Sequence, residues 1–199
     1  MSLELFNALA SFGTFVVIAA TAIAALVQLR HARSANLIEG ISDMNRAFSS
    51  GDYQMAQTFV LTQLKQHWRD PEFRFQYLNR AARSAENRPL ITKILLVANT
   101  YEGLGLMVKR RLIDREMALD MYSGNAIAAW DALTPVAAAA RHKGGRAVWE
   151  NFEYLVVLSR DWVAKYPDGA YPRGVPRIEL DYELRDADAQ YALSRVPSE

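Results

Sequence analysis

Three ionisable residues stand where the chain could do chemistry: Glu102, Arg141 and Glu153 each interrupt or border an apolar helical stretch. A buried carboxylate must be paired, protonated or placed beside a water-filled pocket, because an isolated charge inside a protein is costly. We therefore expect Glu102 to face Arg141 or a neighbouring arginine. Two interpretations stay open: a structural buried polar network, which we favour, and a catalytic pair in a pocket between helices.

Other catalytic and cofactor chemistries find no support in the residue pattern. His31, His67 and His142 fall on separate predicted helices and form no E-x-x-H or H-x-x-x-H pair, so we expect no metal site. Gly103 and Gly105 lack the third glycine of a dinucleotide-binding loop and lie inside a predicted helix. The chain has no cysteine and no G-x-S-x-G elbow, so no nucleophile is indicated and no cofactor is expected.

The elements that must position these residues begin with an apolar stretch from Leu5 to Leu29 that carries no charge. As a helix it is long enough to cross a hydrocarbon layer of roughly 30 Å, and it predicts a membrane anchor. The alternative is a removable signal peptide. Such a peptide needs a positive n-region and a shorter apolar run, whereas the only charge before this run is Glu4.

The flanks of the apolar stretch indicate its orientation. Arg30 and Arg33 follow it at once, and no Lys or Arg precedes it. The positive-inside rule then places the N-terminus outside and the rest of the chain in the cytoplasm, with both arginines at the lipid surface.

Polar residues recur at seven-residue intervals inside the apolar stretch. Such a seam lies on one side of a helix and lets spanning helices approach and hydrogen-bond to each other. It predicts a homodimer, and chance spacing is the alternative. The seam consists of Asn7, Thr14, Thr21 and Gln28.

The remainder reads as one helical domain over residues 34–166. Residues 34–199, the domain together with the tail, hold 21 basic and 21 acidic residues, a balance that argues against a dedicated nucleic-acid binder. The segment Leu90–Val108 is apolar enough to suggest a second membrane crossing. Lys93 and Glu102 oppose this, because an ionisable group in mid-bilayer is costly, and we expect a buried core helix.

Capping and breaking residues predict the helix boundaries. The apolar periodicity of residues 37–48 predicts that the anchor helix runs on to Gly51. Asp52 is expected to cap a helix that ends at the Asp70-Pro71 step, and Asp114 to cap a later one. The other expected features are helices over 72–86 and 146–166, a break at Ser123-Gly124, a kink or new first turn at Pro135, and a turn at Gly144-Gly145.

Two groups of basic residues are candidate surfaces for anionic headgroups or an acidic partner, with an ordinary solvated face as the alternative. The first is the arginine stripe Arg74, Arg80, Arg83 and Arg88. The second is the cluster Arg141, His142, Lys143 and Arg146.

The last segment, residues 167–199, differs in character. It holds four of the seven prolines and many acidic residues, so we expect an extended acidic tail that packs on or trails the bundle. A short helix is expected over Asp186–Leu193.

Short motifs also follow one another in order along the chain. They are residues 28–36 (QLRHARSAN), Tyr101-Glu102-Gly103-Leu104-Gly105, Leu112-Ile113-Asp114, Trp130, Leu133-Thr134-Pro135, Arg141 and Asn151-Phe152-Glu153. In this order the chain resembles a bacterial family of membrane-anchored helical proteins classed only as a domain of unknown function, over most of residues 10–165. The resemblance implies an anchor followed by a cytoplasmic bundle and supplies no catalytic residues.

We therefore expect an all-α protein with one N-terminal transmembrane helix (residues 1–33 with its basic flank), a cytoplasmic bundle of about five or six helices, and the acidic tail. The expected location is the bacterial inner membrane, with the lipid bilayer, an unidentified protein and a second copy as partners. The expected role is a tethered interaction or regulatory module without enzymatic activity. The alternative is an enzyme or small-ligand binder using Glu102, Arg141 and Glu153.

Overall fold

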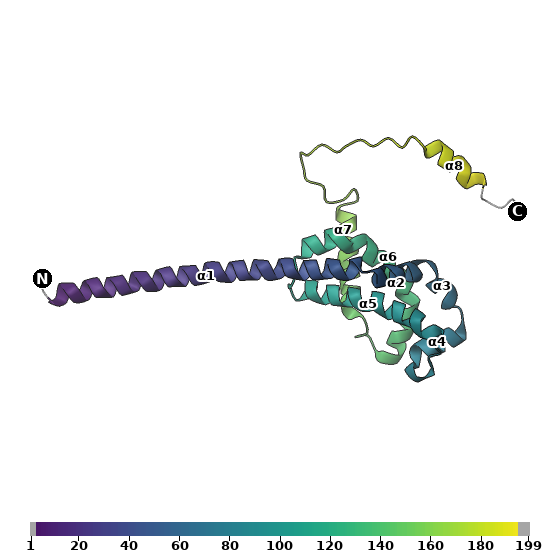
Figure 1. The fold of residues 1–199 in the computed structure, drawn as a ribbon, viewed down its shortest axis with the longest axis horizontal. Coiled ribbons are helices and arrows are strands. Elements are labelled where there is room, and N and C mark those ends of the chain that lie inside the picture. Colours follow the sequence, from purple (N-terminus) through teal and green to yellow (C-terminus); the bar gives the residue numbers. More distant parts are fainter. Residues whose placement is uncertain (1–2, 195–199) are drawn as a thin grey trace. The chain divides into compact units, whose positions relative to one another are not determined.

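The structure, a computed structural model, describes the backbone of residues 3–194 and their side chains except those of residues 3–6, 8–10, 30–39, 189 and 192–194. The described chain is mostly helical and contains no strand, as the sequence predicts. Its contacts divide it into two units, Met1–Gly169 and Ala170–Glu199. The first unit holds the long N-terminal helix and the bundle (Figure 1).

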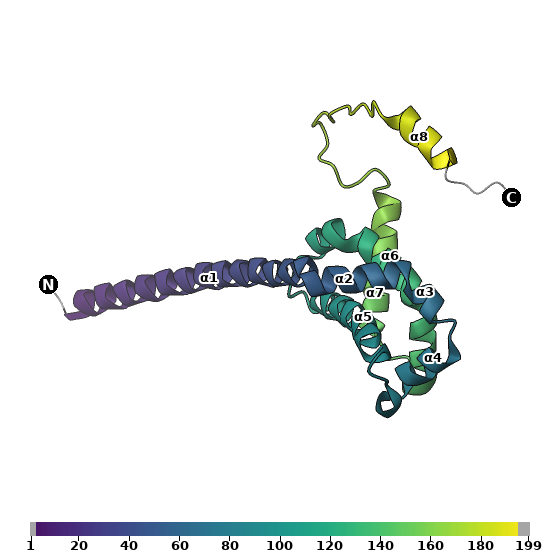
Figure 2. The same ribbon diagram turned by 45° about the vertical axis from the view of Figure 1, so that its right-hand side comes forward.

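One helix, α1 (Leu3–Ser49), carries the chain from its amino end into the bundle (Figures 1 and 2). Its 47 residues rise about 70 Å. Residues Ser11–Leu29 have a mean hydropathy of 2.1, and none of this segment is buried inside the protein. At the other end Phe48 lies in the bundle core. The prediction that the apolar helix runs on beyond Leu29 is confirmed, but the helix ends at Ser49, and Gly51, which was predicted to end it, is the first residue of the next helix.

The next two helices form where we expected one. Ser50 caps α2 (Gly51–Thr62) by accepting a hydrogen bond from the Tyr53 N–H at 3.3 Å, so the predicted cap Asp52 is wrong and lies within the first turn. The helix is interrupted at Gln63, which lies between α2 and α3 (Leu64–His67). Neither glycine nor proline marks this break.

The segment after Pro71 is shorter than predicted. Asp70 caps α4 (Pro71–Leu78) through the Glu72 N–H at 2.9 Å, but the helix ends well before Glu86 and is followed by a single 3-10 turn, η1 (Arg80–Ala82). The reason is the buried Gln76 side chain. Its Oε1 accepts the Ser84 N–H at 2.9 Å and so stabilises an irregular loop in place of further helix.

Two long helices make the centre of the bundle. They are α5 (Asn87–Lys109) and α6 (Arg115–Gly144), which Asp114 caps as predicted by accepting the Met117 N–H at 2.8 Å. The expected break at Ser123-Gly124 is absent: α6 is continuous there, Ser123 is buried, and its hydroxyl donates to the Leu119 carbonyl one turn earlier at 2.5 Å. Pro135 also lies inside α6 and does not start a new helix.

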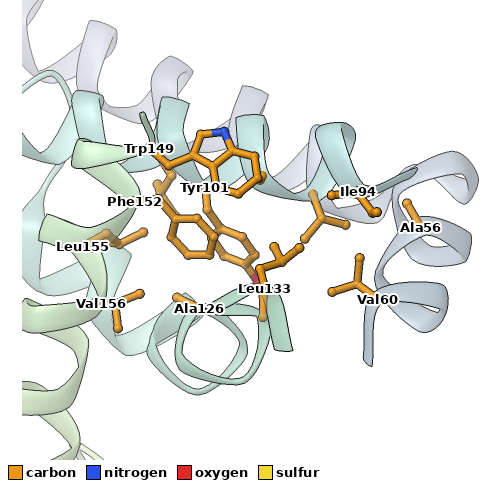
Figure 3. Packing of buried hydrophobic residues seen from close by; sticks show 14 of the residues in the cluster. Ala56, Val60, Ile94, Tyr101, Ala126, Leu133, Trp149, Phe152, Leu155 and Val156 are labelled. Atoms are coloured by element: carbon orange, nitrogen blue, oxygen red, sulfur yellow. The ribbon is translucent and has the colours of Figure 1, made fainter. Parts of the chain in front are cut away.

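The last helix of the bundle is α7 (Glu150–Lys165), which begins later than the predicted residue 146. Gly145 makes the predicted turn with a φ of 81°, and Trp149 at the N-cap also has positive φ, 53°. The core lies where α5 packs against α2, α6 and α7, and Figure 3 shows residues of this cluster. The buried residues of α5 agree with the predicted core helix, although the helix is also long and apolar enough to span a membrane.

The second unit is extended over most of its first half and ends in α8 (Arg185–Ser194), so the short helix predicted over 186–193 is confirmed. Tyr182 donates a hydrogen bond to Asp188 within it, and Arg177 lies 4.6 Å from the Tyr171 ring centroid. Ile178 and Leu180 are almost fully exposed. Whether this tail packs on the bundle stays a prediction, as do the domain boundaries.

Candidate functional site

Glu102 lies on α5 and binds the start of α7. Its Oε1 accepts a hydrogen bond from Asn151 Nδ2 at 2.7 Å, and its Oε2 accepts the Phe152 backbone N–H at 2.8 Å. The N-cap residue of α7, Trp149, makes no capping hydrogen bond through its side chain. Glu102 therefore supplies, from another helix, the negative group that the exposed N–H groups of a helix start favour.

The predicted pairing of Glu102 with Arg141 is wrong. Among the described residues Arg141 forms an ion pair with Glu153 at 3.0 Å, and Glu102 forms none. The Arg141 Nε donates to the Val148 carbonyl at 2.9 Å, and its guanidinium lies 5.5 Å from the Trp130 ring centroid. The carbonyl groups of the turn before α7 have no helical N–H partners, so the Arg141 guanidinium can donate a hydrogen bond to one of them.

A close backbone approach holds α5 and α7 together beside Glu102. A Cβ atom added at Gly105 would lie 2.0 Å from the Asn151 carbonyl oxygen, so only glycine fits there. One turn earlier, the Tyr101 and Phe152 rings stack with centroids 4.8 Å apart (Figure 3). We call the contacts of Tyr101, Glu102 and Gly105 with Asn151 and Phe152 the α5–α7 junction.

Two further residues complete the polar part of this junction. Asn151 is buried, and its Oδ1 accepts a hydrogen bond from Lys109 Nζ at 3.0 Å while its amide donates to Glu102. Lys109 also pairs with Glu150 at 3.3 Å. Sequence reasoning missed Asn151 and Lys109 as members, although Asn151 stands in one of the short motifs and Lys109 lies at the end of the helix that carries Glu102.

The arrangement of Glu102, Arg141 and Glu153 is that of a helix-docking site. The Glu102 carboxylate is already bound on both oxygens, and half of the Glu153 side chain is exposed. Four hollows of the described surface are lined by other residues. The described residues hold no group of three or more His, Cys, Asp or Glu that could bind a metal. The absence of a cofactor stays a prediction.

Three buried tyrosines surround Phe48 where α1 enters the core. The Tyr122 ring stacks on Phe48 at 4.4 Å, and the Tyr53 ring meets it edge-on at 4.9 Å. Burial raises the pKa of Tyr53 and Tyr122, and it raises the pKa of Tyr101 to about 12. All three phenols therefore stay neutral at physiological pH and act as packing groups for the end of α1.

The predicted arginine stripe is split by its contacts. Arg74 donates to the Trp68 and Arg69 carbonyls at 2.7 and 2.8 Å, so it closes the turn before α4. Arg80, Arg83 and Arg88 line a hollow of about 310 Å³. In the second basic cluster Lys143 binds the Leu78 carbonyl at 2.8 Å, while His142 and Arg146 are on the surface.

The predicted association seam lies along α1. Asn7, Thr21 and Gln28 are exposed, and the Thr21 hydroxyl donates to the Val17 carbonyl at 2.7 Å. Thr14 is exposed as well. The side chains of Arg30 and Arg33 lie outside the described residues, as does that of His31, so the structure adds nothing to their predicted roles.

Comparison with known proteins gives one finding. The profile of a protein family described as a domain of unknown function (DUF4760) matches residues 15–162. No curated protein and no solved structure matches the chain significantly. The matched region includes most of the apolar segment of α1 and both sides of the α5–α7 junction, and it ends before the tail.

Proposed function

We propose that this chain, which belongs to the family of the domain of unknown function DUF4760, is a single-pass membrane protein whose bundle is a tethered, non-enzymatic interaction module. The observation that carries the proposal is the continuity of α1. One helix has a fully exposed apolar segment at one end and a core residue, Phe48, at the other.

The apolar segment has the length and surface of a membrane span. Ser11–Leu29 comprises 19 residues, which rise about 28 Å against a hydrocarbon thickness of roughly 30 Å. Phe12, Phe15 and Leu26 are each more than 60% exposed. Water would disfavour so continuous an apolar surface, whereas lipid accepts it. These features support an anchor that is retained in the mature protein.

The charged flank supports an orientation for this anchor. Arg30 and Arg33 follow the apolar segment and no basic residue precedes it. By the positive-inside rule the amino end then lies outside, and the bundle lies on the cytoplasmic side of a bacterial inner membrane. The α1 residues beyond Leu29 form a helical strut that rises about 30 Å to Ser49. The bundle is thereby held at a set distance from the lipid, as suits a protein that meets partners at the membrane.

The α5–α7 junction supports a module over an enzyme. An interhelical active site would need Glu102, Arg141 and Glu153 to converge on a cavity. Glu102 instead binds the first turn of α7, and Arg141 binds the turn before it. Partners in this proposal are the bilayer, a second copy through the seam on α1, and a protein of acidic character at Arg80, Arg83 and Arg88.

Lysine substitution in the apolar segment tests the anchor. Ile18→Lys with Ile23→Lys places two charges at mid-membrane, at an insertion cost of about 2.5–3.5 kcal/mol each. We expect the wild-type chain in the carbonate-washed membrane pellet and the double variant in the supernatant. The matched control is Asp43→Lys with Arg46→Ala on the exposed face of the strut, which should stay in the pellet. Wild-type protein in the supernatant would contradict the proposal.

A further inference from the structure

The turn between α5 and α6 is a basic surface that lies next to α1, in addition to Arg30 and Arg33 on that helix. Both views show it at the end of the bundle that faces the amino end of α1 (Figures 1 and 2). Residues 109–116 carry four basic and two acidic side chains. The sequence alone explains these cations as partners for a helix C-terminus, and only the fold places them next to α1.

A close contact fixes where this turn lies along α1. A Cβ atom added at Gly40 would lie 3.0 Å from Ile113 Cγ2 and 3.5 Å from the Leu112 carbonyl oxygen. Ile113 is buried, so the turn is packed against the helix at this position. Gly40 follows Leu29 by 11 residues, a rise of about 17 Å beyond the end of the apolar segment.

This distance brings the turn within electrostatic reach of lipid headgroups. The headgroup layer of one leaflet is about 5–8 Å thick, which leaves about 10 Å between its edge and the level of Gly40. The Debye length at physiological salt is about 8 Å, and the ordinary tilt of a spanning helix shortens the gap on one side. By contrast, Arg80 and Arg88 lie by the other end of α5, whose 23 residues rise about 35 Å.

The cations of the turn are available to a ligand. Arg110 and Arg115 are exposed, and neither side chain has an ion pair or hydrogen bond within the described residues. Arg111, at a positive φ of 57°, lines a hollow of about 410 Å³ together with Arg115 and Lys109. The two acidic residues of the turn, Asp114 and Glu116, leave a net positive charge, and one oxygen of Asp114 accepts the Met117 N–H. Leu112 beside them is exposed.

We propose that the α5–α6 turn binds anionic lipid headgroups through Arg110, Arg111 and Arg115, and so fixes the bundle against the surface of the membrane that α1 spans. The inference rests on the proposed anchor and adds a second membrane contact to it. Guanidinium groups match the phosphate of a headgroup, and Leu112 can enter the interfacial layer beside them.

Energy transfer from the turn to labelled lipid tests this contact. The chain has no cysteine, so Leu112→Cys takes a single fluorescent donor in the full-length protein. This protein is reconstituted into vesicles that carry an acceptor on their headgroups, made of phosphatidylcholine alone or with phosphatidylglycerol. We expect higher transfer in the anionic vesicles, and a loss of the difference in high salt.

Charge reversal provides the decisive comparison. Arg110→Glu with Arg115→Glu should abolish the lipid-dependent increase, because each arginine near an anionic surface favours the bound arrangement about fivefold. Arg80→Glu with Arg88→Glu is the matched control at the distal end and should leave the increase intact. Both pairs place one glutamate in the first turn of a helix, where it is well tolerated.

The outcomes separate this inference from the anchor. The vesicles are first floated on a density gradient. If the protein does not float with them, both the proposed membrane anchor and the proposed headgroup contact are refuted. A chain that floats, but gives equal transfer in both lipids, refutes the headgroup contact alone. The headgroup contact is also refuted if the distal control removes the increase as completely as Arg110→Glu with Arg115→Glu.

Discussion

Two glycines of α5, two residues apart and so on different faces of the helix, give the sharpest test of the α5–α7 junction. A methyl group at Gly105 would meet the Asn151 carbonyl oxygen at 2.0 Å and its carbon at 2.6 Å, whereas a methyl group at Gly103 meets nothing within 4 Å. The clashing atoms belong to the backbone of α7 and cannot rotate away. Gly105→Ala must therefore push the two helices apart, while Gly103→Ala leaves them in place.

The expected magnitudes follow from the bonds that such a shift breaks. The hydrogen bonds of Glu102 to Asn151 and Phe152 contribute about 1.5–3 kcal/mol, and the stacking of Tyr101 on Phe152 about 0.5–1.5 kcal/mol. Alanine recovers about 1 kcal/mol over glycine inside a helix. We expect Gly105→Ala to lower the free energy of unfolding by about 1–3.5 kcal/mol and Gly103→Ala to raise it by about 1 kcal/mol.

Thermal unfolding of the full chain in mild detergent, followed by far-ultraviolet circular dichroism, measures both effects. For a domain of this size 1 kcal/mol shifts Tm by about 2–4 °C, so Gly103→Ala should raise Tm by about that amount and Gly105→Ala should lower it by roughly 2–14 °C. Equal Tm values for the two variants would refute the close approach of α5 and α7, and with it the interpretation of Glu102 as a helix-docking group.

Three other predictions concern single groups. Glu102→Ala should cost about 1.5–3 kcal/mol in the same unfolding assay and Glu102→Gln less, because glutamine keeps one acceptor; an alanine variant as stable as wild type would remove the capping role. Arg141→Met should free the turn before α7 and speed tryptic cleavage after Arg146, and an unchanged cleavage rate would contradict the anchoring of that turn. Burial raises the pKa of Tyr77 and Tyr101 to about 12, above the unfolded value near 10, so the folded state holds these protons longer. The stability that they contribute is complete below pH 10 and is lost as the pH rises from about 10 to 12, and phenolate absorbance with circular dichroism should show their ionisation together with unfolding. If all tyrosines ionised in one transition near pH 10 while the helices stayed intact, the burial of Tyr77 and Tyr101 would be contradicted.

Local sequence signals predicted most of the helices. The charge-free apolar run and the periodicity that follows it predicted α1, and Asp114 marked the start of α6 because a carboxylate acceptor next to free N–H groups is a local requirement. The errors arose where a distant group decides the structure. The end of α4 depends on Gln76 reaching Ser84, eight residues away, and the predicted break at Ser123-Gly124 failed because Ser123 is buried by neighbouring helices inside a continuous α6.

The candidate site was predicted in part for the same reason. The need of Glu102 for a partner follows from its apolar neighbours, and the structure supplies one. Its identity could not be predicted, because the partners are an amide side chain and a backbone N–H about fifty residues away that carry no charge pattern. Gly105 likewise looks like any small residue in a core helix until the backbone of Asn151 is placed against it.

The most direct test of the account is the intact mass of the chain extracted from washed membranes. A retained anchor predicts a membrane-bound protein with the mass of the full 199 residues, 22.4 kDa, apart from processing of the first methionine. A chain shortened from its amino end through the apolar segment, or an intact chain recovered in the soluble fraction, would contradict the claim that α1 holds the bundle at the membrane.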